Sequence, residues 1–176
     1  MAELFEADFD IKDKLLPYKQ ALIDDYYNNK DNRGYSKKVN IPEVVDIIKP
    51  QWLEIIQYHF HPLPQPRGEF KVWGYVQNNT NNRSVWHNHP EAELNTVFYL
   101  ETPKEGGELE ILNVRPLENK FSKELIKVKE NKLYIMPFWT YHRPKLQKDT
   151  NERICFNVQY FTKDRKRLLQ RNGINW

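Results

Sequence analysis

Three histidines carry the most informative chemistry in this sequence. His87 and His89 stand two residues apart in the segment WHNHP (86–90), and His142 ends a later aromatic segment, PFWTYH (137–142). Imidazole is the commonest side-chain ligand for transition metals, and residues two apart on a strand point to the same side. A third histidine from a distant strand would close one face of a metal ion and leave the opposite face open. The spacing therefore predicts a mononuclear metal site.

The remaining ligand candidates are weaker. His59 and His61 stand at a proline-rich passage (61–66), and we expect them to be surface or structural residues. Glu93 follows His89 after one short loop and offers a carboxylate, so the third ligand is either His89 or Glu93. Three imidazoles would leave the charge of a divalent ion uncompensated by protein, which favours an acidic cosubstrate.

The bulk composition narrows the class of protein. The chain has 176 residues, enough for one domain with a proper core, and its formal charge of +3 gives no indication of nucleic acid binding. A single cysteine, Cys155, excludes an internal disulfide framework and a cysteine-rich zinc site. No apolar run approaches the roughly 20 residues that cross a bilayer, and the acidic start does not resemble a signal peptide. We expect a soluble, cytoplasmic protein.

The first part of the chain has helical patterns. Apolar residues recur at three- and four-residue steps over 11–26, with Pro17 expected to end or bend that helix. A second helix is expected from a cap at Asn40, with Pro42 in its first turn and apolar positions as far as residue 56. Pro50 threatens its continuity. These helices are expected to support a sheet.

From residue 70 the pattern changes to short segments rich in β-branched and aromatic residues, separated by turns of Asn, Gly, Pro and Lys. Eight such segments predict an antiparallel jelly roll, the cupin-like double-stranded β-helix. The predicted strands are 70–77, 84–87, 95–101, 108–113, 125–129, 132–136, 141–145 and 153–161. A single domain follows, with helical support over 1–68, a jelly-roll core over 69–162 and a basic, solvated tail over 163–176.

Four sequence features occur in a fixed order around the histidines. The pair His87 and His89 precedes the strand VFYL (97–100), a GGEL turn (106–109) follows, and then a Pro-x-x-x-x-His element (137–142) and Arg153. This order resembles the 2-oxoglutarate and Fe(II)-dependent oxygenases, in particular small single-domain members related to prolyl hydroxylases. The resemblance covers roughly residues 70–161. His89 occupies the place of the usual carboxylate, and some small members of that superfamily look similar there, with a His-x-His-Pro element.

The resemblance implies an activity and its cofactors. Fe(II) would be held by His87, His89 and His142, with 2-oxoglutarate and dioxygen as cosubstrates and an unidentified prime substrate that is hydroxylated. Oxidative decarboxylation of 2-oxoglutarate to succinate and carbon dioxide would accompany that hydroxylation.

Three residues are expected to hold 2-oxoglutarate. Strand alternation places Arg153, Cys155 and Asn157 on one face, so Arg153 would face into the barrel, where a guanidinium needs an anionic partner. That partner is either the distal carboxylate of 2-oxoglutarate or a protein acid. By resemblance, Tyr99 could donate its hydroxyl to the same carboxylate. Asn157 shares the face of Arg153 and is expected in the same cosubstrate-binding set.

Two other functions remain open. A three-His cupin dioxygenase that needs no 2-oxoglutarate has a similar histidine layout, although the 106–107 glycine turn and Arg153 count against it. A non-enzymatic jelly-roll module could bind a sugar or a partner protein through an aromatic face. In an oxygenase the aromatic residues would instead wall the pocket, with the segments 59–67 and 78–83 as candidate lids. The wall candidates are Trp73, Tyr75, Trp86, Trp139 and Tyr141.

Overall fold

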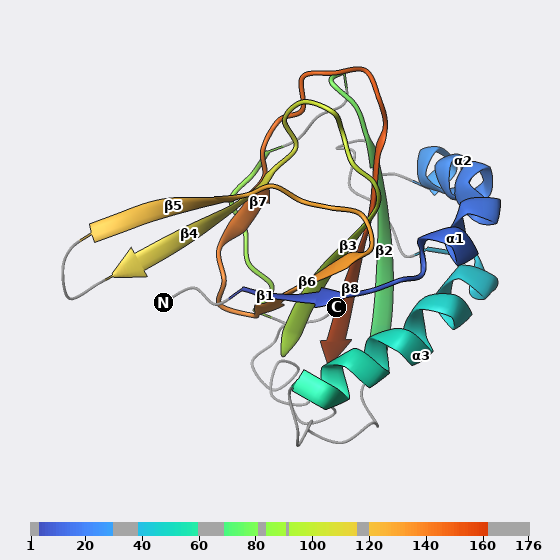
Figure 1. The fold of residues 1–176 in the computed structure, drawn as a ribbon, viewed down its shortest axis with the longest axis horizontal. Coiled ribbons are helices and arrows are strands. Elements are labelled where there is room, and N and C mark those ends of the chain that lie inside the picture. Colours follow the sequence, from blue (N-terminus) through green and yellow to red (C-terminus); the bar gives the residue numbers. More distant parts are fainter. Residues whose placement is uncertain are drawn as a thin grey trace.

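The computed structural model describes residues 4–29, 39–59, 69–80, 84–90, 92–115 and 120–161. In this part of the chain, two antiparallel sheets form a jelly roll, with helices against the outer face of the larger sheet (Figure 1). The larger sheet has the order β1-β6-β3-β8-β2, and the smaller has the order β5-β4-β7. The predicted fold class, mainly β with N-terminal helices, is confirmed. The strands are β1 (Phe5–Asp8), β2 (Glu69–Gln77), β3 (Leu94–Glu101), β4 (Leu109–Arg115), β5 (Lys120–Ile126), β6 (Lys132–Pro137), β7 (His142–Pro144) and β8 (Arg153–Phe161).

Prolines shape the helical part of the chain in two different ways. Pro17 lies in a 3-10 turn (Leu16–Tyr18) between α1 (Lys12–Leu15) and α2 (Lys19–Asn29), so the predicted interruption is confirmed. Pro50 lies inside α3 (Pro42–His59) and does not end it. None of the described helices is long and apolar enough to cross a membrane.

The start of α3 differs from the predicted cap. The helix begins at Pro42, and the carbonyl of Ile41 accepts the N–H groups of Val44 and Val45, so Ile41 rather than Asn40 caps it. The side chain of Asn40 instead donates to Asp25 of α2, at 3.3 Å. Pro42 explains the shift, because proline is well suited to the first helical position, where its missing N–H costs nothing.

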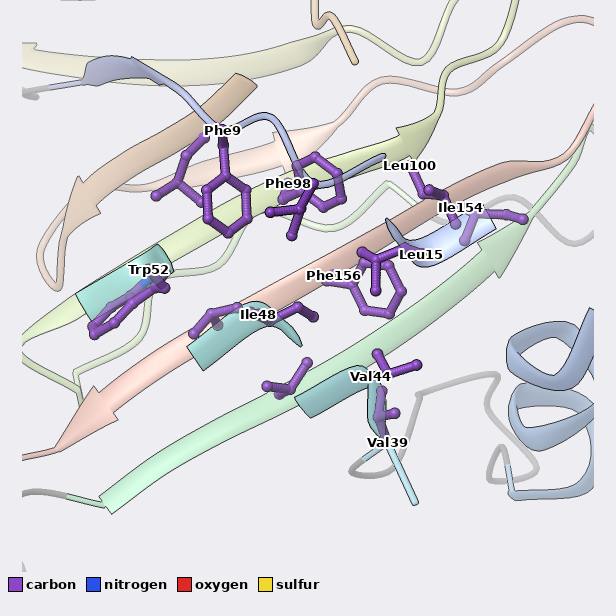
Figure 2. Packing of buried hydrophobic residues seen from close by; sticks show 14 of the residues in the cluster. Phe9, Leu15, Val39, Val44, Ile48, Trp52, Phe98, Leu100, Ile154 and Phe156 are labelled. Carbon is purple, nitrogen blue, oxygen red and sulfur yellow. The ribbon is translucent and has the colours of Figure 1, made fainter. Parts of the chain in front are cut away.

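The larger sheet buries its outer face under α3. Val44, Ile48 and Trp52 project from this helix onto Phe98 and Phe156 of the central strands (Figure 2). The indole N–H of Trp52 donates to Thr96 Oγ1 at 2.8 Å, which ties the helix to β3 by a buried hydrogen bond. This packing fixes which face of β3 and β8 points inward.

The inner face of the larger sheet meets the smaller sheet in a second apolar cluster. Val97 and Tyr99 of β3 and Cys155 of β8 pack there with Leu109 and Ile111 of β4. The neighbours of Cys155 on β8, at positions 154 and 156, belong to the outer cluster. The predicted alternation of β8 is therefore confirmed, and residues 153, 155 and 157 point into the space between the sheets.

Three strand predictions were wrong. Residues 84–87 form only an isolated bridge at His87, and the strand expected at 125–129 is β5 (Lys120–Ile126), which makes a projecting hairpin with β4 (Figure 1). Strand β1 was missed, although it lies within the segment expected to be helical and pairs with β6, Phe5 opposite Ile135. Both β1 and β5 are mostly exposed, so they lack the apolar alternation that marks a strand in sequence.

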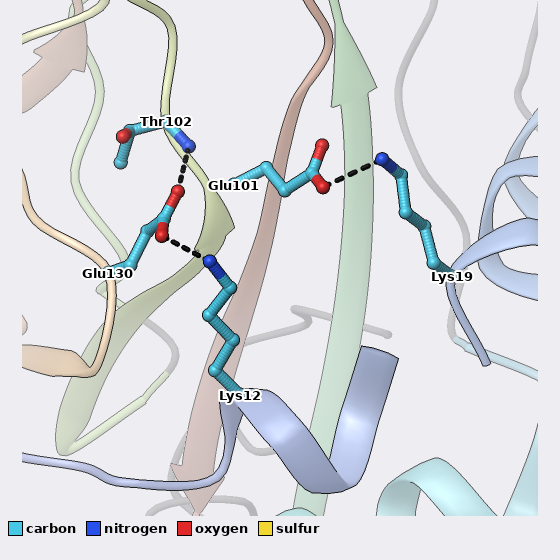
Figure 3. Close-up of polar contacts among 5 residues, drawn as sticks. All are labelled: Lys12, Lys19, Glu101, Thr102 and Glu130. Atoms are coloured by element: carbon cyan, nitrogen blue, oxygen red, sulfur yellow. Dashed lines mark hydrogen bonds and ion pairs between the residues drawn. The ribbon is translucent and has the colours of Figure 1, made fainter. Parts of the chain in front are cut away.

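Ion pairs join the helical part to the strand ends. Lys12 pairs with Glu130, whose other carboxylate oxygen accepts the N–H of Thr102 at 3.2 Å, and Lys19 pairs with Glu101 at 2.7 Å (Figure 3). These pairs lie at the end of β3 and at the turn before β6, so they connect the helical part to the sheet at these two places.

Several predictions concern residues outside the described part of the chain. They are the basic tail (163–176), His61, most of the candidate lid 59–67 and the end of the candidate lid 78–83. The side chain of His59 is also outside the described set.

Candidate metal centre

Backbone pairing brings the three histidines together. His142 is the first residue of β7 and pairs with Ile111 of β4. The N–H of His142 donates to the carbonyl of His87 at 2.9 Å, and the N–H of His87 donates back at 3.1 Å. The N–H of His89 donates to the carbonyl of Phe138 at 3.3 Å. Two segments far apart in sequence are thereby locked side by side at one edge of the smaller sheet.

The three imidazoles form one compact group. One ring nitrogen from each lies within 4.8 Å of the others. The ring centroids are 4.5 Å apart for His87 and His142, 5.0 Å for His87 and His89, and 5.3 Å for His89 and His142. Within the described residues this group contains no carboxylate, and Glu93 does not belong to it. The donor set that the structure assembles is therefore three nitrogens.

Hydrogen bonds fix the proton positions on two of the rings. Nδ1 of His87 lies 2.8 Å from the carbonyl of Val85, and Nδ1 of His142 lies 3.0 Å from the carbonyl of Thr140. A carbonyl can only accept, so Nδ1 must carry the hydrogen in each neutral ring. Each Nε2 then presents a lone pair, which is the state that binds a metal ion.

Burial keeps His142 neutral. Its side chain is 3% exposed, and desolvation together with the nearby rings of His87 and His89 lowers its pKa to about 3 from an ordinary value of 6.5. A neutral imidazole has no proton to lose when a cation binds. The ring is thus neutral over the whole physiological pH range.

This lowered pKa makes the metal-free protein sensitive to acid. Below pH 6.5 the unfolded chain binds a proton at His142, whereas the folded chain does not bind it until the pH reaches about 3. The free energy of unfolding therefore falls as the pH falls between these two values. Between pH 7 and pH 5 we expect this group to lower the free energy of unfolding by about 2 kcal/mol. Urea unfolding with a chelator present measures it, compared with His142→Gln. An equal pH slope in the two proteins would contradict the assignment.

The second component of the site is a buried guanidinium. Arg153 is 1% exposed, and its Nη2 donates to Oε1 of Gln77, its register partner on β2. Its Nε and Nη1 have no hydrogen-bond partner, and no carboxylate in the described part of the chain pairs with it. The alternative of a protein acid as partner therefore finds no support among the described residues. A buried cation in this state favours an anionic ligand.

The glycine turn packs against this guanidinium. Gly106 and Gly107 have φ angles of +77° and +72°, in the left-handed region that favours glycine. A Cβ at Gly107 would lie 2.4 Å from Cγ of Pro103 and 3.5 Å from Nη1 of Arg153. The GGEL motif thus allows the loop to close tightly over the arginine.

Tyr99 lies near Arg153 on the inner face. It is 2% exposed, and burial raises its pKa well above the usual range, while the positive charge of Arg153 acts in the opposite direction. The hydroxyl is therefore a neutral donor. Burial likewise raises the pKa of the neighbouring Cys155 thiol, which stays protonated and serves as a small apolar filler.

A row of buried polar atoms lies on the same face. Asn157 sits opposite Trp73 of β2 and opposite Val97 of β3. Leaving a buried polar atom without a hydrogen bond costs about 1 to 3 kcal/mol, so such atoms commonly mark the place of a ligand. Among the described residues, the buried atoms on this face without a hydrogen-bond partner are Nε1 of Trp73, Nδ2 and Oδ1 of Asn95, and Oδ1 of Asn157.

The aromatic wall candidates fall into three groups. Trp73 and Tyr75 are partly buried on β2, and Tyr75 packs against the inner cluster. Trp86 lies under the guanidinium of Arg143, whose Cζ is 4.6 Å from the centroid of the Trp86 ring. Trp139 and Tyr141 are about half exposed and flank the metal group along the chain instead of lining the interior.

Sequence reasoning missed three residues of the site. Gln77 holds Arg153, Gln159 contacts His89, and Asn95 lies opposite Gln159. The alternation of β8 already placed Gln159 on the face of Arg153, so that signal was available. Gln77 and Asn95 could be found only from the strand register.

Comparisons with known proteins were informative only at the level of structure. No protein-family model matches the chain, and no curated protein matches its sequence. A prolyl 4-hydroxylase from Phytophthora capsici has a TM-score of 0.63 at 13% identity, over 92% of this chain and 59% of that chain. This chain thus spans less than two thirds of that enzyme.

Two further solved structures are covered over most of their length. A prolyl-4-hydroxylase from Pseudomonas putida has a TM-score of 0.58 at 11% identity, over 93% of this chain and 89% of that chain. A Trichoplax adhaerens prolyl hydroxylase, in complex with a hypoxia inducible factor oxygen degradation domain peptide fragment, has a TM-score of 0.56 at 15% identity, over 94% and 86%. The chain shares the jelly-roll fold of these hydroxylases.

Proposed function

We propose that this protein is an Fe(II)- and 2-oxoglutarate-dependent oxygenase, most simply a hydroxylase. The observation that carries the proposal is the buried guanidinium of Arg153, which pairs with no carboxylate among the described residues. It lies on the inner face of the same jelly roll in which the three imidazoles come together. The shared fold with prolyl hydroxylases supports it.

The three imidazoles fit a ferrous ion. His87, His89 and His142 would hold it through nitrogens, and the carbonyl-bound Nδ1 atoms of two of them leave Nε2 ready to coordinate. When bound, iron would supply the activation of dioxygen, which protein side chains cannot perform. The chain's part is to orient the rings and, by burial, to keep His142 neutral.

The inner face carries groups that could bind a dicarboxylate such as 2-oxoglutarate. Arg153 would bind the distal carboxylate through Nε and Nη1, and Tyr99 would donate its neutral hydroxyl. Asn157 would contact the cosubstrate from the same strand. With three neutral ligands, the second carboxylate would balance the charge of the metal ion, which a protein carboxylate does in the usual ligand set. The apolar side chains of Val97 and Cys155 would exclude water from this part of the inner face.

A three-His dioxygenase that needs no 2-oxoglutarate is the second candidate. The observation in its favour is the absence of a carboxylate from the metal group in the described residues. Arg153 counts against it, because such an enzyme would leave this buried charge without an anionic partner among the described residues. The non-enzymatic module is the third candidate, and it would need no metal.

One assay separates these functions. Metal-free protein is supplied with Fe(II), dioxygen and 2-oxoglutarate, and succinate and residual oxygen are measured. The oxygenase is expected to form succinate only when all three are present. Oxygen consumption with a thiol, but without succinate, would support the second candidate instead. A protein that binds no metal would support the third.

Gln77 offers a test of the anion site that leaves the metal group untouched. Gln77→Glu places a carboxylate against Arg153, and this internal ion pair should compete with 2-oxoglutarate. We expect at least a tenfold weaker binding of 2-oxoglutarate to Mn(II)-loaded protein by calorimetry, with Gln77→Met as the uncharged control. Unchanged affinity in Gln77→Glu would mean that Arg153 is not the anchor.

A further inference from the structure

The third imidazole of the metal group is held differently from the other two. The rings of His87 and His142 each have a backbone carbonyl at Nδ1. Nδ1 of His89 instead lies 2.6 Å from the side-chain amide of Gln159 on β8, and Gln159 is 5% exposed. The ring that stands where a carboxylate is usual is therefore oriented by a side chain.

The chemistry of this contact depends on which end of the amide faces the ring. In the structure the amide nitrogen faces Nδ1. Gln159 then donates, and the hydrogen of a neutral His89 ring sits on Nε2, where it would block coordination. The nitrogen and oxygen of a glutamine amide differ by a half-turn about one bond, and the placement of neighbours decides between them. With the oxygen toward Nδ1, the ring donates and Nε2 carries a lone pair, as in the other two rings.

We propose that Gln159 is the positioning residue of His89, and that its amide oxygen accepts the Nδ1 hydrogen so that all three imidazoles present Nε2 to one metal ion. This inference rests on the metal site of the proposed function. It adds an explanation of how a histidine can replace the carboxylate at this place. A carboxylate needs no tautomer to be chosen, whereas a histidine does.

The strand geometry supports this role. Gln159 points inward on β8, three alternations after Arg153, so one strand carries the proposed anchor at one end and the positioning residue at the other. Asn95, opposite Gln159 on β3, is buried with neither of its amide atoms hydrogen bonded. The surroundings of the Gln159 amide are thus polar, and either orientation can be accommodated.

Metal affinity is the first test, because it needs no turnover. Titration with Co(II), followed by its visible absorption, is compared in wild type, Gln159→Leu and Gln159→Glu. We expect Gln159→Leu to weaken binding roughly tenfold, since loss of an outer-shell partner commonly costs a factor of 10 to 100. Gln159→Glu keeps an acceptor oxygen and should bind at least as tightly as wild type. Gln147→Leu changes another buried glutamine, whose amide donates to the carbonyl of Asn151, and this matched control should retain wild-type affinity.

The tautomer of His89 can be observed directly. Nitrogen-15 spectra of the Zn(II)-loaded wild type should show the His89 hydrogen on Nδ1.

The outcomes separate this inference from the proposed function. Wild type that binds no Co(II) would overturn the metal site itself. Wild type that binds Co(II), with Gln159→Leu equal to it, would overturn the role of Gln159 alone. Equal losses in Gln159→Leu and Gln159→Glu would also overturn it, because a packing role does not distinguish an acceptor from an alkyl group.

Discussion

Arg153→Ala is expected to raise the 2-oxoglutarate concentration needed for turnover by on the order of 10- to 150-fold. That factor corresponds to the loss of a hydrogen bond to a charged group, about 1.5 to 3 kcal/mol. The structure makes the upper part of this range reasonable, because the guanidinium is buried, has two N–H-bearing nitrogens without partners and has no carboxylate beside it among the described residues. Initial rates of succinate formation over a series of 2-oxoglutarate concentrations measure it.

A second arginine, Arg143 on β7, is the matched control for Arg153→Ala. Arg143 follows His142, but it pairs with Glu110 and lies over Trp86. Arg143→Ala should therefore leave the 2-oxoglutarate requirement unchanged. If Arg153→Ala also left it unchanged, the anchor would have to lie elsewhere and the oxygenase proposal would lose its main support.

His142→Ala is expected to abolish stoichiometric metal binding. The substitution removes one of three nitrogens and the only one of the three rings that is fully buried, so the remaining two histidines would form an incomplete site with little affinity. Metal analysis after equilibration with a slight excess of Fe(II), without oxygen, gives the stoichiometry. Thermal unfolding of the metal-free variant separates loss of a ligand from loss of the fold.

Two further variants make the result specific to the histidine group. His142→Gln fills more of the space of the ring and should also fail to bind iron. His61→Ala removes a histidine to which the sequence assigns no ligand role, and it should bind one equivalent, as wild type does. Retention of one tightly bound iron by His142→Ala would contradict the ligand set.

The site residues that sequence could predict are those that follow a local rule. The alternation of β8 placed Arg153 inward, because the period of a strand is a property of the backbone. The two-residue spacing of His87 and His89 was a useful signal although their segment is not a strand, since separate backbone hydrogen bonds to His142 and Phe138 hold the two residues. The order of motifs then pointed to His142 as the distant third member. In the structure the three histidines form one group, as expected.

The residues that sequence could not reveal depend on long-range register. Gln77 is opposite Arg153 only because β2 pairs with β8 at that offset, and Asn95 is opposite Gln159 only through the pairing of β3 with β8. Strands β1 and β5 were missed or misplaced for a related reason: their side chains are mostly exposed, so no apolar alternation marks them. Pairing with a neighbour, which the local sequence does not encode, makes them strands.

A histidine at position 89, where the proposed family usually has a carboxylate, makes the proposed metal site less negative. Three imidazoles bring no negative charge, and among the described residues the buried charge on the inner face is the positive Arg153. A dianionic cosubstrate would thus meet two positive centres, the metal ion and the guanidinium, with no opposing carboxylate from the metal group. We expect the affinity for 2-oxoglutarate to depend strongly on both centres, and Arg153→Ala and His142→Ala test them one at a time.

A crystal structure with Mn(II) and 2-oxoglutarate, grown without oxygen, would test the central claim most directly. We expect one metal ion bonded to nitrogens of His87, His89 and His142, and one 2-oxoglutarate whose distal carboxylate lies within hydrogen-bond distance of Arg153. A metal ion bound away from these rings, or a guanidinium that still has no anion at saturating 2-oxoglutarate, would contradict the account.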